Sequence, residues 1–407
     1  MKKLFNVKKL IGINKKIDNI FECPSPYWYL VNRSDNNSNN SQKNMVVFFG
    51  NDMEGVLGFG VSSKDQYVSR VNECLDYIRQ NFIGFDLCYK SHPGDAGEQN
   101  YLNLAGFRIL DVKITAEIFM ADNLKKLRAV FTVGSFSAFN GYSMGIDSHV
   151  FYHCFSDIYN RDFIISLDQS FFEMPQSFFV KKLDQELPNN SRDLKNDQFL
   201  KSILKKNLDK NSGKIWLLCS FSEYTVFLGI LTQIIRELSP NRQVGFIASY
   251  HHRWEPIRNY LNNYFDEVVF MPRIHYSIKP SRLWESFKIA RQIRNFKMDP
   301  EDILMVASQP DFVENCFVSY HQNNHKIGLA NKRDFRAQYD PKSLTYTAYD
   351  EFRFNKATWF FNKIFEPLLG IHRSLFLAFT SMNGFYFNRY QKPLNEIFDQ
   401  LILFHVA

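Results

Sequence analysis

The sequence has no long uninterrupted hydrophobic run. Its most apolar stretch, residues 357–387, is interrupted by Lys363, Glu366, Pro367, His372 and Arg373. A helix that crosses a bilayer needs about 20 consecutive apolar residues. We therefore expect a cytoplasmic protein, with at most a peripheral contact at the inner face of the membrane.

Signatures of disulfide, zinc or dinucleotide chemistry are also missing. The six cysteines include no CxxC pair, which favours reduced, buried thiols over a zinc site or a disulfide framework. The glycine-rich GxGxxG fingerprint and the Walker loop are absent, so NAD and P-loop chemistry have no support. We also expect no nucleophile elbow of the GxSxG type. No metal or other cofactor is expected.

The charge of the chain is only mildly basic. Lys and Arg total 49 against 42 Asp and Glu, which gives a formal net charge of +7. This excess suits an anionic substrate or membrane headgroups, and it is too small for a nucleic-acid-binding face. Aromatic residues are abundant at 16%, so we expect bulky cores.

Two polar segments divide the chain. Residues 32–44 are rich in Asn and Ser, and residues 186–213 contain ELPNNSRD and KNLDKNSG around a short helix expected at 198–206. A chain of 407 residues is long enough for two or three domains. We expect an N-terminal segment and linker at 1–44, a domain at 45–185, a linker at 186–213 and a second domain at 214–407.

Strands and helices alternate in both blocks. In the first, the pattern predicts strands at 45–50, 86–89, 107–109, 129–133 and 149–152, with helices at 63–80 and 138–144. In the second, it predicts helices at 223–238 and 282–295 and strands at 214–219, 244–247, 267–270, 303–306 and 327–329, the last as an edge or final strand. Strands joined by helices form parallel sheets. The predicted fold class is therefore α/β, with two Rossmann-like domains and helices on both faces of each sheet.

The first candidate site directly follows the strand at 86–89 and reads Tyr89-Lys90-Ser91-His92-Pro93. Open parallel sheets bind ligands at the carboxyl ends of their strands. The proline keeps His92 out of the helical region, so the imidazole stays at this edge. A protonated imidazole beside a phosphate forms a hydrogen bond worth about 1.5–3 kcal/mol. The alternative is a loop histidine without a ligand.

The second candidate site is the turn Val133-Gly134-Ser135-Phe136-Ser137-Ala138, between a strand and a helix. Such a turn presents backbone N–H groups, the positive end of a helix and hydroxyl groups to an anion. Gly134, Ser135 and Ser137 are therefore candidate phosphate ligands. The alternative is that Ser137 merely caps its own helix, which contributes about 1 kcal/mol.

Together the two motifs give residues 45–155 a known arrangement. The order is a helix at 63–80, YKSHP, GFRI, a helical turn at 116–120, and VFTVGSFSAF before a helix ending at MGIDSHVFY. This order resembles the C-terminal nucleotide-binding domain of bacterial GT-B sialyltransferases and capsule polysialyltransferases. The resemblance implies that the His92-Pro93 element contacts the phosphate of a CMP-sugar donor and that Ser137 hydrogen-bonds it. Ala138 departs from the family, which usually has a second Ser or Thr there.

The same family carries an Asp/Glu-Asp/Glu-Gly motif in which one carboxylate is the general base. The nearest match here is Asp350-Glu351-Phe352, where Phe replaces the glycine. The two blocks also run in the reverse of the family's order. Residues 17–21 (IDNIF) and 395–398 (NEIF) look like two versions of one interdomain connection. The resemblance therefore implies a circular permutation or a fragment of a tandem transferase.

The function implied by this resemblance is glycosyl transfer in surface polysaccharide synthesis. An acidic, sialic-acid-like sugar passes from a CMP donor to a glycan acceptor by one inverting displacement. Asp350 or Glu351 removes the acceptor proton, while His92 and the Ser135–Ser137 turn stabilise the departing phosphate. A homo-oligomer or a complementing chain is expected if the chain is a fragment. Two alternatives stay open: a teichoic-acid-type polyol-phosphate transferase and a degenerate binding or assembly protein.

Overall fold

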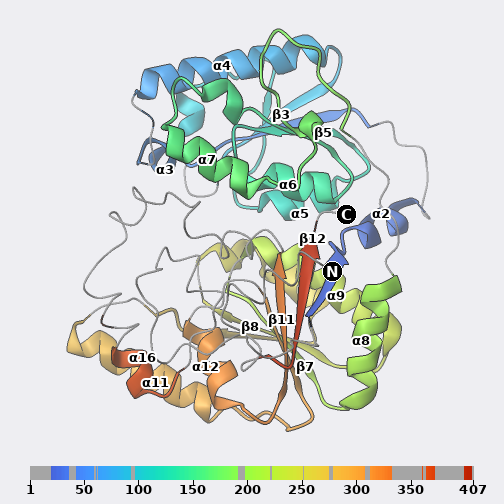
Figure 1. The fold of residues 1–407 in the computed structure, drawn as a ribbon, viewed down its shortest axis with the longest axis vertical. Coiled ribbons are helices and arrows are strands. Elements are labelled where there is room, and N and C mark those ends of the chain that lie inside the picture. The colour runs from blue at the N-terminus through green and yellow to red at the C-terminus, as the bar shows by residue number, and fades with distance from the viewer. Residues whose placement is uncertain are drawn as a thin grey trace. The chain divides into compact units, whose positions relative to one another are not determined.

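The computed structural model describes residues 20–35, 43–58, 61, 63–92, 97–190, 198–220, 222–250, 252–274, 278–307, 312–331, 360, 364–371 and 398–405. The chain divides into two compact units (Figure 1). The five-stranded unit comprises Ser25–Asp197, Thr225–Ile230 and Val406–Ala407, and the seven-stranded unit comprises Met1–Pro24, Gln198–Tyr224 and Leu231–His405. Each unit holds one parallel sheet with flanking helices, which confirms the prediction of two Rossmann-like α/β domains.

The sheet of the five-stranded unit has the order β4-β3-β2-β5-β6, and all its pairs are parallel. Its strands are β2 (Met45–Phe49), β3 (Asp86–Lys90), β4 (Arg108–Ile109), β5 (Leu127–Thr132) and β6 (Asp147–Val150). The chain moves outward from β2 to β3 and β4, and then returns to β5 on the other side of β2. The direction of winding therefore reverses between β2 and β5, which makes this pair the topological switch point.

Helices flank these parallel strands. They are α2 (Trp28–Asp35), α3 (Met53–Gly58), α4 (Lys64–Asn81), α5 (Ala116–Asp122), α6 (Phe136–Ser143) and α7 (Arg161–Ser170). Helix α2 precedes β2 and α7 follows β6, while α3 to α6 carry the chain between strands of the sheet. The short 3₁₀ helices of this unit are η1 (Glu98–Asn100), η2 (Tyr152–Phe155) and η3 (Gln176–Phe178). Parallel strands need such crossovers because a tight turn joins only antiparallel neighbours.

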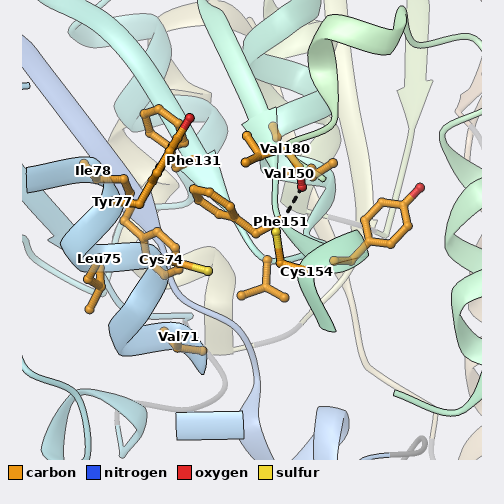
Figure 2. Close-up of a cluster of buried hydrophobic side chains, with 14 of the residues drawn as sticks. Val71, Cys74, Leu75, Tyr77, Ile78, Phe131, Val150, Phe151, Cys154 and Val180 are labelled. Atoms are coloured by element: carbon orange, nitrogen blue, oxygen red, sulfur yellow. Dashed lines mark hydrogen bonds between the residues drawn. The ribbon is translucent and has the colours of Figure 1, made fainter. Parts of the chain in front are cut away.

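Helix α4 shows how local sequence builds this core. Ser63 caps its N-terminus by accepting a hydrogen bond from the Gln66 backbone N–H at 3.4 Å. The buried residues of α4 recur at helical spacing and form one apolar face: Tyr67, Val71, Cys74, Leu75, Tyr77 and Ile78. Figure 2 shows this face beside Phe131, Phe151 and Cys154, whose thiol donates to the Val180 carbonyl at 3.2 Å.

The sheet of the seven-stranded unit has the order β1-β12-β11-β10-β7-β8-β9 and is also parallel throughout. Its strands are β1 (Ile20–Pro24), β7 (Ile215–Leu218), β8 (Val244–Ser249), β9 (Glu267–Met271), β10 (Ile303–Ala307), β11 (His325–Asn331) and β12 (Gln400–His405). Its switch point lies between β7 and β10. Strands β8 and β9 are added on one side of this pair, and β11 and β12 are added on the other.

The remaining helices are α8 (Gln198–Lys210), η4 (Ser222–Tyr224), α9 (Thr225–Leu238), η5 (His252–Ile257), α10 (Arg258–Tyr264), α11 (Pro280–Arg294), α12 (Phe312–Tyr320) and α16 (Glu366–Leu368). A buried cluster joins Ile293 of α11 and Phe317 of α12 to Trp216 and Leu218 on β7. No described helix is both long and apolar enough to span a bilayer.

Three elements differ from the sequence expectation. Residues 20–24, expected in an N-terminal segment, form β1 and pair with β12, so that Ile20 lies opposite Leu401. Strand β11, expected as an edge or final strand, lies between β10 and β12. Helix α8, expected to end at 206, continues to Lys210 within the seven-stranded unit. Strands β1 and β12 were missed because each is a short apolar run beside residues without a clear pattern.

Replacing Gly141 of α6 by alanine is expected to lower the free energy of unfolding by about 1–2 kcal/mol, because overpacking outweighs the gain in helix propensity. A Cβ atom at this position lies 2.7 Å from Val130 Cγ2 and 2.8 Å from Ser148 Oγ. Gly134→Ala is the matched control, since its Cβ lies 3.4 Å from the nearest Leu167 atom, an ordinary contact. Urea denaturation of both variants measures the difference, and equal stabilities would contradict the close helix–sheet contact.

Candidate functional site

The switch point of the five-stranded sheet brings three chain segments to one edge. Phe49, the last residue of β2, is in register with Lys90 on β3 and with Thr132 on β5. The segments that leave these strands therefore begin at the same level of the carboxyl edge. Doubly wound sheets bind ligands at this edge.

The two predicted motifs lie on either side of β2. His92 follows Lys90 by two residues, and Gly134 follows Thr132 by two residues. Neighbouring strands are about 4.8 Å apart, so motifs separated by one strand begin about 10 Å from each other. A nucleotide is long enough to reach both. The structure thus places both motifs at one edge of one unit.

The serine turn is organised by Ser135. Its hydroxyl caps α6 by accepting a hydrogen bond from the Ser137 backbone N–H at 3.3 Å. Its own backbone N–H donates to Thr132 Oγ1 at 3.2 Å. The Ser135 and Ser137 hydroxyl oxygens lie 3.1 Å apart. The helix cap is therefore Ser135 rather than Ser137, so both hydroxyls and the first turn of α6 converge on one place.

Gly134 is not required by the fold. Its backbone has no positive φ, and a Cβ atom there makes only ordinary contacts with Leu167 and Tyr152. Gly141 in the same helix differs, because its Cβ overlaps the sheet. Leu167 and Tyr152 pack against the side of Gly134 on which a Cβ atom would lie, so the missing side chain does not by itself open the turn to a ligand.

The histidine motif is described only in part. His92 is half-buried and follows Ser91, whose hydroxyl donates to Gln99 Oε1 at 3.3 Å. Pro93 lies outside the described residues. The structure therefore shows where the histidine leaves β3, and the contribution of the proline stays a prediction.

A buried polar cluster beside this edge was missed by the sequence analysis. The fully buried Glu98 carboxylate accepts hydrogen bonds from the Asn51 backbone N–H at 3.0 Å, Tyr89 Oη at 2.6 Å and Tyr67 Oη at 3.2 Å. A Cβ atom on Gly50 would overlap Glu98 Oε2 and Tyr89 Oη, so a side chain there would displace the hydrogen bond between them. These bonds tie the segment that follows the histidine motif to the end of β2.

The cluster keeps its phenols protonated. Burial raises the pKa of Tyr67 well above 10, and the Glu98 charge raises it further. Burial and the same charge raise the pKa of Tyr159. Protonated phenols are the donors that a buried carboxylate requires. The glycine at the end of β2 was the only local sign of this cluster, because Glu98 lies 47 residues beyond Asn51.

Lys90 forms a second polar contact at the end of β3. Its side chain is only 2% exposed, and Nζ donates to the Asp111 carbonyl at 2.9 Å. Burial lowers its pKa to about 8, against the opposing effects of the Asp111 and Glu117 charges. Glu117 in turn accepts a hydrogen bond from Asn140 Nδ2 at 2.9 Å. Lys90 therefore fastens the segment between β4 and α5 to the sheet.

The seven-stranded sheet carries a buried carboxylate near its own switch point. The Ser220 hydroxyl, just after β7, donates to Glu314 of α12 and accepts a hydrogen bond from the Ser249 backbone N–H at 3.1 Å. Glu314 is 1% exposed. The contact links the ends of β7 and β8 to the first turn of α12.

The predicted acidic motif, Asp350 and Glu351, lies outside the described residues, so its role stays a prediction. Among the residues that the structure does describe, no group of three or more His, Cys, Asp or Glu side chains is arranged to hold a metal ion.

Residues 141–145 (GYSMG) match the GxSxG pattern of nucleophile elbows, so the expectation that the sequence lacks this pattern is wrong. An elbow places its serine on a tight turn between a strand and a helix. Here Ser143 is the last residue of α6 and is 1% exposed. The pattern therefore marks the close packing of α6 and carries no nucleophile.

Ser135→Ala is expected to lower the free energy of unfolding by about 1 kcal/mol, because the cap of α6 is lost. Ser137→Ala, which leaves the cap in place, is expected to change it by less than about 0.5 kcal/mol. Urea denaturation compares the two variants. A larger loss in Ser137→Ala than in Ser135→Ala would contradict the assignment of the cap.

The substitution Lys90→Met tests whether burial lowers the pKa of the Lys90 ammonium group. Because burial lowers the Lys90 pKa from 10.5 to about 8, the unfolded chain binds more protons between these values. The wild-type free energy of unfolding then gains up to about 1.4 kcal/mol per pH unit from this residue as pH rises. The stability of Lys90→Met minus that of the wild type is expected to fall between pH 8 and pH 10. A constant difference in urea denaturation would contradict the lowered pKa.

Comparison with known proteins adds no assignment. No protein-family model matches the chain, and a search of curated proteins gives no significant match.

Proposed function

We propose that the five-stranded unit binds the phosphate of a nucleotide-activated donor at its switch point, and that the chain is a GT-B-type glycosyltransferase using a CMP-activated acidic sugar. The observation that carries this proposal is that His92 follows β3 and the Ser135–Ser137 turn follows β5 at the carboxyl edge, on either side of β2. The order of motifs along residues 45–155 supplies the choice of donor through its resemblance to sialyltransferases.

The chemistry of the serine turn supports an anion at this place. The turn lies at the positive end of α6, where the Ser137 and Ala138 backbone N–H groups donate to the Ser135 hydroxyl and carbonyl. Ser137 adds a hydroxyl that does not cap α6. The Ser135 and Ser137 hydroxyls lie 3.1 Å apart at this place. The two hydroxyls and the positive end of α6 together favour one phosphate.

In the proposed reaction, the acceptor hydroxyl oxygen forms a bond to the anomeric carbon while the bond from that carbon to the CMP phosphate oxygen breaks. The electron pair of the broken bond goes to the phosphate, where His92 and the serine turn stabilise the charge. The acceptor proton goes to Asp350 or Glu351. The roles of these two acids rest on the resemblance alone. The proposed acceptor is a surface glycan made at the inner face of the membrane.

His92→Ala and Ser137→Ala are each expected to weaken CMP binding by roughly 10- to 150-fold, which corresponds to the loss of one hydrogen bond to a charged group. Isothermal titration calorimetry with CMP measures the effect. Ser202→Ala is the matched control, because Ser202 is exposed on α8 and its hydroxyl donates only to a local carbonyl. Equal affinities for the two site variants and the wild type would overturn the assignment of the site.

Activity assays separate the alternatives. Incubation with CMP-sialic acid and with CDP-polyols distinguishes a sialyltransferase from a polyol-phosphate transferase by its product. CMP binding without transfer from either donor would support the non-catalytic alternative. If an active preparation of His92→Ala kept the full transfer rate, the catalytic role of His92 would be abandoned.

A further inference from the structure

Helix α11 of the seven-stranded unit has an aromatic face that the described fold leaves uncovered. Trp284 is 57% exposed and Phe287 is 38% exposed. The opposite face of the helix is buried through Ile289 and Ile293. Burying large aromatic side chains is favourable. Their exposure on a helix whose other face is well packed indicates that lipid or another molecule covers this surface.

The exposed residues form one continuous face. Trp284, Phe287, Lys288 and Arg291 follow the i, i+3, i+4 and i+7 spacing of a single helix side. The Trp284 and Phe287 rings stack with centroids 5.3 Å apart, and Lys288 Nζ lies 5.7 Å from the Trp284 ring centroid. Two aromatic rings are therefore followed by two basic groups along the exposed side.

The face is also strongly basic. Helix α11 contains four cations, Arg282, Lys288, Arg291 and Arg294, against one carboxylate, Glu285. Glu285 pairs with Arg282 at 2.8 Å, and Arg282 lies on the side of Ser286 and Ile289, away from the exposed rings. Lys288 and Arg291 are therefore the basic residues of the exposed aromatic face.

Further apolar side chains border α11 within the same unit. Ile278, just before the helix, is 54% exposed. At the other end, Arg294 Nη2 donates to the Leu369 carbonyl at 3.1 Å, and the adjacent Leu368 of α16 is 78% exposed. Figure 1 shows α16 beside α11. The apolar surface therefore extends beyond both ends of the helix.

We infer that α11 lies on a membrane surface that contains anionic lipids. An interfacial helix buries Trp and Phe at the level of the headgroups while Lys and Arg reach outward to lipid phosphates. Each basic residue near an anionic surface strengthens such binding. A protein-binding face of this size usually lacks lysine at its centre, whereas Lys288 lies directly beside Trp284. This inference depends on α11 alone and is independent of the proposed transfer reaction.

The experiment is sedimentation of the full-length chain with vesicles. Vesicles of equal phosphatidylglycerol and phosphatidylcholine are expected to bind the protein, and vesicles of phosphatidylcholine alone much less. Lys288→Glu/Arg291→Glu is expected to weaken binding to the anionic vesicles by roughly thirtyfold or more. Trp284→Ala/Phe287→Ala is expected to weaken it by at least tenfold, because both rings leave the interface.

The control variants carry comparable changes in charge and in exposed apolar surface at other places in the chain. Lys205→Glu/Lys206→Glu makes the same charge change on exposed residues of α8, and Ile83→Ala removes an exposed apolar side chain after α4. Both controls are expected to bind as the wild type does, and urea denaturation checks that every variant folds. Failure of the wild type to bind anionic vesicles overturns the inference in favour of a protein partner. Equal binding by the α11 variants and the controls also overturns it, because the contact then lies elsewhere.

Discussion

Parallel strand pairing is the constraint on which both units depend. Every neighbouring pair within the two sheets is parallel. Each strand must therefore be followed by a crossover, and all carboxyl ends within a sheet gather at one edge. In the five-stranded unit this places the segments after Phe49, Lys90 and Thr132 at one level. A site formed from residues more than 40 positions apart then needs no long loops.

Buried polar groups hold this edge in shape. Removing a charge from water is costly unless hydrogen bonds replace the lost solvation. Glu98 accepts three such hydrogen bonds and Lys90 donates one to a backbone carbonyl, and these bonds offset the cost of burying the two charges. The same bonds also fix the neighbouring segments of the chain. Tyr89, which donates to Glu98, and Lys90 lie on opposite faces of β3, the strand that His92 follows. The candidate site thus rests on a rigid frame rather than on free loops.

The serine turn and α11 illustrate two different uses of a helix. In the turn, function is proposed for the helix end, where backbone donors and the Ser137 hydroxyl meet. In α11, it is proposed for the helix side, where Trp284 and Lys288 combine apolar area with charge. The first requires a sheet to position the helix start, and the second requires only that one face be left uncovered. Both features are therefore compatible with one chain that handles a charged donor near lipids.

The sequence alone determined the fold class and most of the strands. Runs such as MVVFF at Met45–Phe49 are apolar on both sides, because a strand covered by helices on both faces has no polar face. The helical spacing of Tyr67, Val71 and Ile78 likewise identified α4. The sequence also placed His92 and the Gly134–Ser137 turn at strand ends. These properties are local, so neighbouring residues are enough to predict them.

Only the tertiary structure decided what depends on distant residues. It paired Ile20 with Leu401 and so placed β1 in a sheet whose other strands follow much later in the chain. It assigned the α6 cap to Ser135 through backbone geometry that composition does not reveal. It also brought Glu98 to Asn51 and Tyr67, and it left Trp284 uncovered. Pairing, burial and exposure arise from contacts between residues far apart in the chain, and no local pattern specifies which of many apolar or polar residues will meet.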